Sequence, residues 1–198
     1  RLELSGLKVI SANTDGIVIY YNVEQRDLLT SIVKQWEKDC NFTTEENFYH
    51  GLHSRDVNNY IALKSDKDCQ IIKGVKLKGA YTDYWYSDIN SFRMKNTPDL
   101  IICRQAVIEY ITKKIPIETT IKECKDILKF CSVRNVRGGG LFRGKPFGRV
   151  ARFYKSSISR DCLISSTTNG MVSNSRNAEL CLDLPREFPL DIDWDFYI

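Results

Sequence analysis

The chain has 198 residues, of which 42% are hydrophobic and 27% are charged, and its formal net charge is +4. Such a composition excludes a chain that is disordered throughout and indicates a globular protein of one large or two small domains. No run approaches the roughly 20 apolar residues of a membrane span and no basic-then-apolar segment opens the chain, so we expect no membrane partner and a soluble, cytoplasmic protein.

The seven cysteines are scattered along the chain without a Cys-x-x-Cys pair. This spacing is typical of a protein from a reducing compartment. The only two histidines are His50 and His53, and the nearest cysteine, Cys40, is ten residues away from them. Because a zinc site needs closely spaced ligands, none is expected here.

Residues 1–6 have the pattern of a last helical turn that Gly6 ends in the C′ position. The chain therefore starts inside an element and has no initiating Met, so we expect it to be a fragment or one chain of a split protein. Two apolar, β-branched runs follow and flank Asn13, Thr14, Asp15 and Gly16. This pattern predicts two strands and a tight turn. Asn, Asp and Gly are common turn formers, so the tip alone indicates only a turn.

The next elements alternate between helix and strand. Asn22 is expected to cap a helix that ends near Lys38 and has one apolar face. Two strands are predicted over residues 57–64 and 70–81, and the pattern of residues 42–54 favours a further one. The order predicts an α+β fold, with a mixed or antiparallel sheet and packed helices.

The periodicity weakens over residues 81–92, which we interpret as a connection between domains. Thr97 and Pro98 should cap and open a helix that ends near Lys114. A second helix is expected from about Glu118, and its apolar stripe is formed by Ile121, Cys124, Leu128 and Cys131. We interpret the two cysteines of this stripe as core residues.

Charge is distributed unevenly over the last seventy residues. Residues 129–160 contain nine Lys or Arg and no acidic residue, whereas residues 179–198 contain six acidic residues and one Arg. Glycines interrupt the basic segment, and this pattern favours close contact with the backbone of a polyanion such as duplex DNA. A nucleotide-binding P-loop is not expected, because Lys145 is followed by Pro146 and not by Ser or Thr.

Four stretches, in this order, resemble the C-terminal part of a B-family DNA polymerase of the bacteriophage type. They are residues 13–16, similar to the D-T-D-S motif; 55–62, similar to the strand ending in K-K-R-Y; 75–79, similar to the lysine-x-lysine-glycine strand; and 191–198, similar to the D-x-x-Y-Y-I end of the thumb. The chain departs from these motifs at Asn13, Gly16 and Asn58, where the family has aspartate, serine and lysine.

The resemblance implies the C-terminal part of a polymerase palm over residues 1–95 and a mainly helical thumb over residues 96–198. Asp15 would be the catalytic metal ligand, holding Mg²⁺, or Mn²⁺ in its place, for two-metal nucleotidyl transfer. The second carboxylate lies in the family's first motif, upstream of Arg1. We therefore expect this chain to be inactive without the upstream polymerase portion, which holds the exonuclease and fingers and is carried on the same or a separate chain.

The resemblance also implies primer–template DNA and dNTP as partners. Asn13, Thr14 and Gly16 would complete the active-site hairpin. The expected DNA contacts are polar or basic: Arg55, Asn58, Asn59, Tyr60, Lys76, Lys78 and Gly79 near the active site, and Arg143, Lys145, Arg149, Arg152 and Lys155 in the basic segment. Such contacts position DNA without sequence readout. Two alternatives remain: a non-catalytic DNA-binding or assembly subunit with a degenerate palm, and a protein-interaction module with a solvated basic face.

Overall fold

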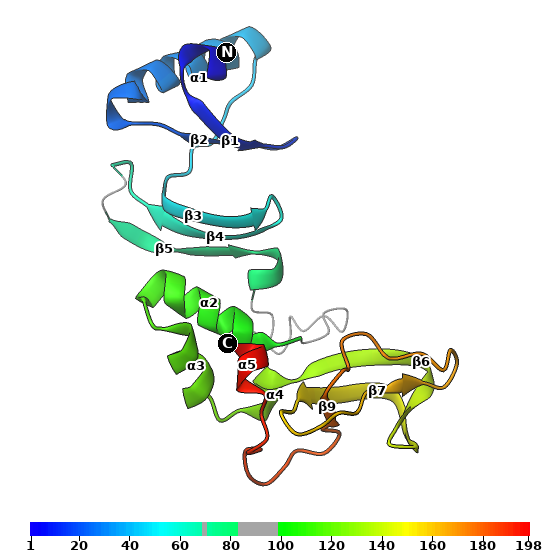
Figure 1. The fold of residues 1–198 in the computed structure, drawn as a ribbon. Coiled ribbons are helices and arrows are strands. Elements are labelled where there is room, and N and C mark those ends of the chain that lie inside the picture. The colour runs from blue at the N-terminus through cyan, green and yellow to red at the C-terminus, as the bar shows by residue number, and fades with distance from the viewer. Residues whose placement is uncertain (69–70, 83–98) are drawn as a thin grey trace. The chain divides into compact units, whose positions relative to one another are not determined.

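The computed structural model describes residues 1–68, 71–82 and 99–198 (Figure 1). The chain divides into two compact units, Arg1–Thr82 and Asp83–Ile198, each with both helices and strands. The α+β class is therefore confirmed. Most of the predicted connection at 81–92, the predicted boundary near residue 95, and the predicted helix start at Thr97 and Pro98 lie outside the described residues.

The first unit begins with the predicted hairpin, formed by strands β1 (Lys8–Ala12) and β2 (Ile17–Tyr20) in antiparallel register. The helical turn before it is the short 3-10 helix η1 (Glu3–Ser5), and Gly6 ends it with φ +80°. The glycine stop is thus confirmed, although the turn is tighter than an α-helix.

Asn22 caps a 3-10 turn, η2 (Val23–Gln25), which continues into helix α1 (Arg26–Cys40). The Gln25 side chain accepts a hydrogen bond of 3.0 Å from the Asn22 backbone N–H, which forms a capping box. The predicted N-cap is therefore confirmed, with one turn of different geometry between the cap and the α-helix. Figure 1 shows α1 beside the hairpin, although no residue of α1 is fully buried.

A three-stranded antiparallel sheet follows, with strands β3 (Tyr49–Asp56), β4 (Asn59–Ser65) and β5 (Ile72–Lys78) in the order β3-β4-β5. All three strands were expected from the sequence. The central strand β4 contains the buried run Ile61, Ala62 and Leu63. A short 3-10 helix, η3 (Gly79–Tyr81), follows β5.

The described part of the second unit starts with three helices, α2 (Ile101–Lys113), α3 (Ile117–Glu123) and α4 (Ile127–Phe130). The predicted single helix after Glu118 is wrong, because Cys124 has an extended backbone with ψ +124°. The Asp126 carboxylate then accepts a hydrogen bond of 3.0 Å from the Leu128 backbone N–H and caps a new helix. Cys131 is buried, as predicted, and Cys124 is partly buried.

The rest of the second unit is a four-stranded antiparallel sheet in the order β8-β6-β7-β9. Its strands are β6 (Ser132–Phe142), β7 (Lys145–Lys155), β8 (Ile164–Ser165) and β9 (Ala178–Leu180). The expectation of a mainly helical second part is therefore wrong, because the basic segment forms the two longest strands. Its glycines obscure the strand pattern: Gly138, Gly139 and Gly148 adopt φ of +77° to +85° where the β6–β7 register shifts.

The sheet is covered on both faces at the end of β7. Phe153 and Tyr154 are consecutive and point to opposite faces. Phe153 belongs to a cluster with Phe147 and Ala151, whereas Tyr154 packs in a second cluster that includes residues of α2, α3 and α4. The core of this unit therefore extends over two layers, one on each face of the sheet.

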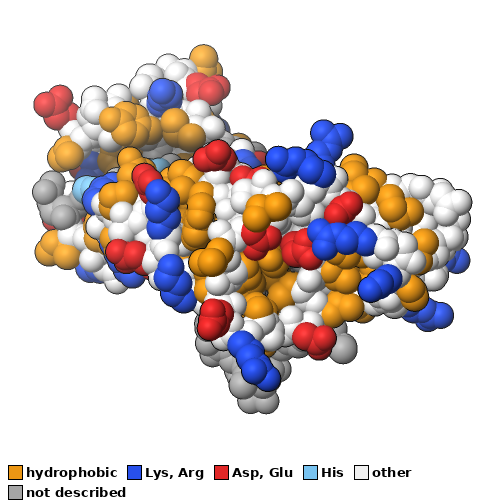
Figure 2. Space-filling model, turned by 60° about the horizontal axis from the view of Figure 1, so that its bottom comes forward, with side chains coloured by type: hydrophobic (Ala, Val, Ile, Leu, Met, Phe, Trp, Pro, Cys, Tyr) orange, Lys and Arg blue, Asp and Glu red, His pale blue; other side chains and the backbone are white. Residues whose placement is uncertain are grey.

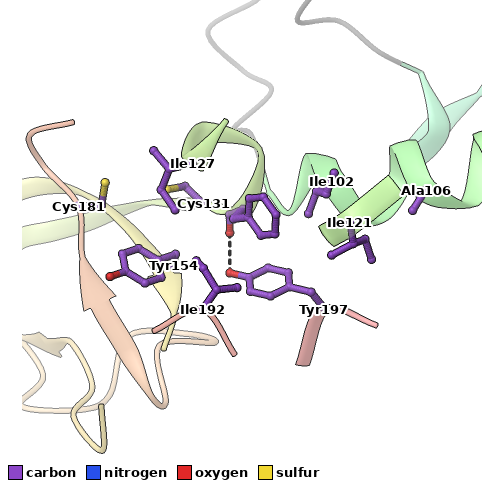
Figure 3. Packing of buried hydrophobic residues seen from close by; sticks show 10 residues of the cluster. Ile102, Ala106, Ile121, Ile127, Cys131, Tyr154, Cys181, Ile192 and Tyr197 are labelled. Atoms are coloured by element: carbon purple, nitrogen blue, oxygen red, sulfur yellow. Dashed lines mark hydrogen bonds between the residues drawn. The ribbon is translucent and has the colours of Figure 1, made fainter. Parts of the chain in front are cut away.

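The end of the chain is part of the second cluster (Figure 3). Helix α5 (Trp194–Tyr197) is capped by Asp193 and buries Tyr197. The Tyr197 hydroxyl donates a hydrogen bond of 2.8 Å to the Phe130 carbonyl and accepts one of 2.9 Å from the Lys155 backbone N–H. One side chain thereby joins the last helix to α4 and to β7.

Replacing Tyr197 by Phe should lower the free energy of unfolding of the second unit by about 1–3 kcal/mol, since two buried backbone groups lose their partner. Urea denaturation of the purified chain measures this change. Tyr110→Phe is the matched control, because Tyr110 is 51% exposed, and should change the same quantity by less than about 0.5 kcal/mol. Equal effects of the two substitutions would contradict the role given to Tyr197.

Candidate functional site

The tip of the β1–β2 hairpin is organised by the side chain of Asn13. Its Oδ1 accepts hydrogen bonds from the backbone N–H of Asp15 at 2.9 Å and of Gly16 at 2.8 Å. The Asn13 backbone N–H donates to the Gly16 carbonyl at 3.0 Å. An asparagine that bonds the backbone two and three residues ahead fixes a turn. The amide oxygen of Asn13 is therefore committed to the turn.

Asp15 and Thr14 are exposed at this tip. Within residues 1–68, 71–82 and 99–198, no hydrogen bond or ion pair engages the Asp15 carboxylate. The same residues contain no group of three or more His, Cys, Asp or Glu side chains that could hold a metal ion. One carboxylate can supply only part of a Mg²⁺ coordination shell. A metal at Asp15 would need further ligands from water, substrate or residues beyond those described.

A second candidate surface lies on the β3-β4-β5 sheet. The register of β4 and β5 pairs Tyr60 with Lys78, Ala62 with Lys76, and Lys64 with Gly74. Residues directly opposite on neighbouring strands share a face, as do alternate residues of one strand. Tyr60, Lys64, Lys76 and Lys78 therefore lie on one face, which we call the lysine face.

The two faces of the sheet differ in charge. Ile61 and Leu63, which alternate with the residues of the lysine face, are buried on the opposite face. On the lysine face, the Lys78 ammonium lies 5.6 Å from the centroid of the Tyr60 ring. In the described part of the chain, none of the three lysines has a carboxylate partner. Lys64 was missed in the sequence analysis, although its spacing of four residues from Tyr60 is the signal for a shared face.

The β3–β4 turn is held by Asp56. Its carboxylate accepts from the Asn58 backbone N–H at 2.9 Å and from the Asn59 amide at 2.7 Å. The hydrogen bond from Asn59 is the main cause of the lowered pKa of Asp56. Asn59 Oδ1 accepts from the Ala80 backbone N–H at 2.7 Å, and Arg55 donates to Asp56 at 3.2 Å. Arg55 and Asn59, both predicted to contact DNA, thus have protein partners in this turn.

Gly79 is required by the same turn. It has φ +65°, and a Cβ at this position would collide with the Asn58 carbonyl oxygen and the Asn59 side chain. The glycine therefore allows the end of β5 to approach the β3–β4 turn. This packing explains the glycine without DNA, and the predicted DNA contact of Gly79 stays a prediction.

Three predicted DNA-binding residues of the basic segment are engaged by the second unit itself. Arg143 donates to Asp161 at 2.6 Å and to Glu179 at 2.7 Å, and these hydrogen bonds raise its pKa. Arg152 donates to the carbonyls of residues 181 and 182. Lys155 is buried, which lowers its pKa, and its ammonium donates to the carbonyls of residues 174 and 176.

Other cations of this segment are available at the surface. Lys145 and Arg149 are exposed, as is Arg137, which the sequence analysis did not select. In the described ranges, no ion pair or hydrogen bond occupies these three side chains. On the face shown in Figure 2, cationic and acidic side chains are interspersed among hydrophobic ones. The ion pairs of Arg143 with Asp161 and Glu179 partly neutralise the basic segment in the folded unit.

No family model, curated protein or solved structure matches the chain. Of the helices in residues 1–68, 71–82 and 99–198, none is both long and apolar enough to cross a membrane. Among the described residues, the exposed carboxylate of Asp15 and the lysine face are the two candidates for binding a ligand.

Replacing Gly79 by Ala should lower the free energy of unfolding of the first unit by about 1–3 kcal/mol, because the side chain meets both a positive φ and an occupied space. Thermal or urea denaturation measures the loss. Gly74→Ala is the matched control on the same strand, since a Cβ there meets nothing within 4 Å. A neutral Gly79→Ala would show that the turn does not depend on this glycine.

Proposed function

We propose that this chain is the C-terminal portion of a DNA-directed DNA polymerase of the B family, with Asp15 as a metal ligand in the palm. The observation that carries the proposal is the exposed Asp15 carboxylate at a hairpin tip fixed by Asn13. A preorganised carboxylate on a rigid element is what a metal-dependent site requires. The four stretches that resemble family motifs support the same assignment.

In this proposal Asp15 contributes one carboxylate to a pair of Mg²⁺ ions. The bound ions would neutralise the nucleotide triphosphate and orient the primer hydroxyl. The chain's own contribution is to present an exposed Asp15 carboxylate, because the side chain that makes the turn hydrogen bonds is that of Asn13 and Asp15 takes part only through its backbone N–H. The second carboxylate would come from the family's first motif, for which residues 1–198 offer no counterpart.

The proposed partner is primer–template DNA, bound through its phosphates. The lysine face supports this, because three lysines without carboxylate partners in the described residues lie on one face of a sheet. Lys145 and Arg149 would add contacts from the second unit, which we propose to be the thumb. Arg143, Arg152 and Lys155 would act indirectly, by holding that unit together. Binding through phosphates is salt-sensitive and tolerant of sequence.

One observation favours the alternative of a non-catalytic DNA-binding or assembly subunit. Asn13 stands where the family motif has its first aspartate, and its side chain oxygen is occupied by two backbone N–H groups. A tip that needs asparagine for its turn has the properties of an ordinary hairpin. This alternative keeps the DNA binding and drops the metal-dependent chemistry.

Replacing Asp15 by Ala in the polymerase assembled with its upstream portion should reduce primer extension by on the order of 10³-fold or more, the scale of losing a charge-stabilising group in phosphoryl transfer. Duplex affinity should change little, because Asp15 does not belong to the lysine face. Gel-based extension and fluorescence anisotropy measure the two quantities.

The matched control for this substitution is Glu24→Ala, which removes an exposed carboxylate from η2. It should leave extension within about twofold, as expected for a surface substitution with a small energetic effect. Retained extension in Asp15→Ala would refute the metal-ligand assignment.

Lys76→Ala and Lys78→Ala should each weaken DNA binding by the chain and lower the slope of log K against log salt by about 0.9, the value for one lost phosphate contact on B-DNA. Anisotropy titrations between about 50 and 200 mM salt give the slope. Lys38→Ala on α1 controls for net charge and should lower the slope less. An affinity that does not fall with salt would favour the protein-interaction module.

A further inference from the structure

An opening in the lysine face lies at Gly74. This glycine is opposite Lys64 in the β4–β5 register, so a side chain at position 74 would stand on the lysine face. A Cβ built at Gly74 meets no atom within 4 Å, and the backbone there does not have the positive φ that would demand glycine. No packing contact and no positive φ demands the glycine, although the β4–β5 register shifts next to it, between Lys64 and Ser65, where a glycine often marks a β-bulge.

The opening continues a regular series of positions along the sheet. Lys78, Lys76 and Gly74 alternate on β5, so successive positions are about 7 Å apart and the series is roughly 14 Å long. Lys64, on β4, lies beside Gly74, so it places a cation next to the third position of the series. Ala62, beside Lys76, is also small, but it is fully buried beneath its neighbours. Three cations thus border a strip that is open at Gly74.

The neighbouring strand leaves this strip without negative charge. On β3, Leu52 is paired with Ala62 and Ser54 with Tyr60. Tyr49 is paired with Lys64. No carboxylate occurs at these three β3 positions, so the charge of the strip at these pairs is that of its lysines. At roughly 14 Å, the strip is long enough for a few phosphates of one strand, since each strand of a duplex carries a phosphate at every nucleotide.

We propose that one strand of the bound nucleic acid runs along the β5 side of the lysine face, with its phosphates contacted by Lys78, Lys76 and Lys64 and its backbone seated over Gly74. This inference rests on the proposed DNA binding and adds to it the path of the strand along β5 and over Gly74. The absent side chain at position 74 lets the backbone approach the sheet closely. The contacts are to phosphate, so the strip fixes the path of the strand and reads no sequence.

An acidic peptide is the competing occupant of a lysine row. A nucleic acid is favoured because its charges are regularly spaced along a stiff backbone, as the cations are along the strip. The bulk of a nucleotide backbone also accounts for the opening at Gly74, which charge alone would not require.

The test measures binding of a fluorescein-labelled duplex of about 20 base pairs by the whole chain, at several salt concentrations between about 50 and 200 mM. Lys64→Ala should lower the salt slope by about 0.9. Gly74→Phe should weaken binding about tenfold, the scale of one or two lost phosphate contacts, with an unchanged thermal melting curve. Gly74→Ala controls for backbone effects, and Lys67→Ala, in the turn between β4 and β5, controls for charge.

The outcomes separate this inference from the function on which it rests. If the wild-type chain does not bind DNA, both are overturned. If Lys76→Ala and Lys78→Ala weaken binding but Lys64→Ala and Gly74→Phe behave as their controls, the path over Gly74 is overturned and DNA binding stands. If a polyglutamate peptide of equal charge competes as well as DNA and shows the same dependence on Lys64 and Gly74, the nucleic-acid assignment is overturned.

Discussion

The hydrogen bonds accepted by Asn13 at the hairpin tip are the constraint on which the proposed chemistry depends. They fix the turn through the backbone N–H groups of Asp15 and Gly16. Because the asparagine side chain makes the turn, the aspartate side chain is left for another purpose. The same bonds limit what the tip can do, since Asn13 cannot also serve as a metal ligand through its amide oxygen while it holds the turn. The hairpin can thus supply one carboxylate, that of Asp15, to a metal site, and the other ligands would have to come from elsewhere.

The register between β4 and β5 plays the corresponding part for binding. It places Lys64, Lys76 and Lys78 on the face opposite to the buried Ile61 and Leu63. In the second unit, by contrast, folding brings the basic and acidic segments together, as when Arg143 bonds both Asp161 and Glu179. A block of charge in a sequence therefore overstates the charge available to a partner, because side chains distant in sequence neutralise it. A row of cations on one strand face keeps its charge when no acidic residue faces it.

The sequence was sufficient to predict the elements whose periodicity is regular. The hairpin, α1 and the three strands of the first unit follow from apolar alternation, helical spacing and turn residues. The strands β6 and β7 were missed because Gly138, Gly139 and Gly148 create bulges that disrupt alternation. The break at Cys124 was missed because the apolar stripe continues across it while Asp126 starts a new helix. Of the candidate site, the turn at Asp15 was predictable, and Lys64 could have been found from its spacing from Tyr60. The partners of Arg143, Arg152 and Lys155 depend on long-range pairing that one sequence does not reveal.

We propose that this chain belongs to an enzyme that extends DNA with the help of metal ions held in part by Asp15. The most direct measurement is primer extension by the wild-type chain joined to its upstream portion, with and without Mg²⁺. The proposed function predicts templated extension that stops when the metal is removed and resumes when it is restored. An assembled protein that binds primer–template DNA but extends it with neither Mg²⁺ nor Mn²⁺ would contradict the claim.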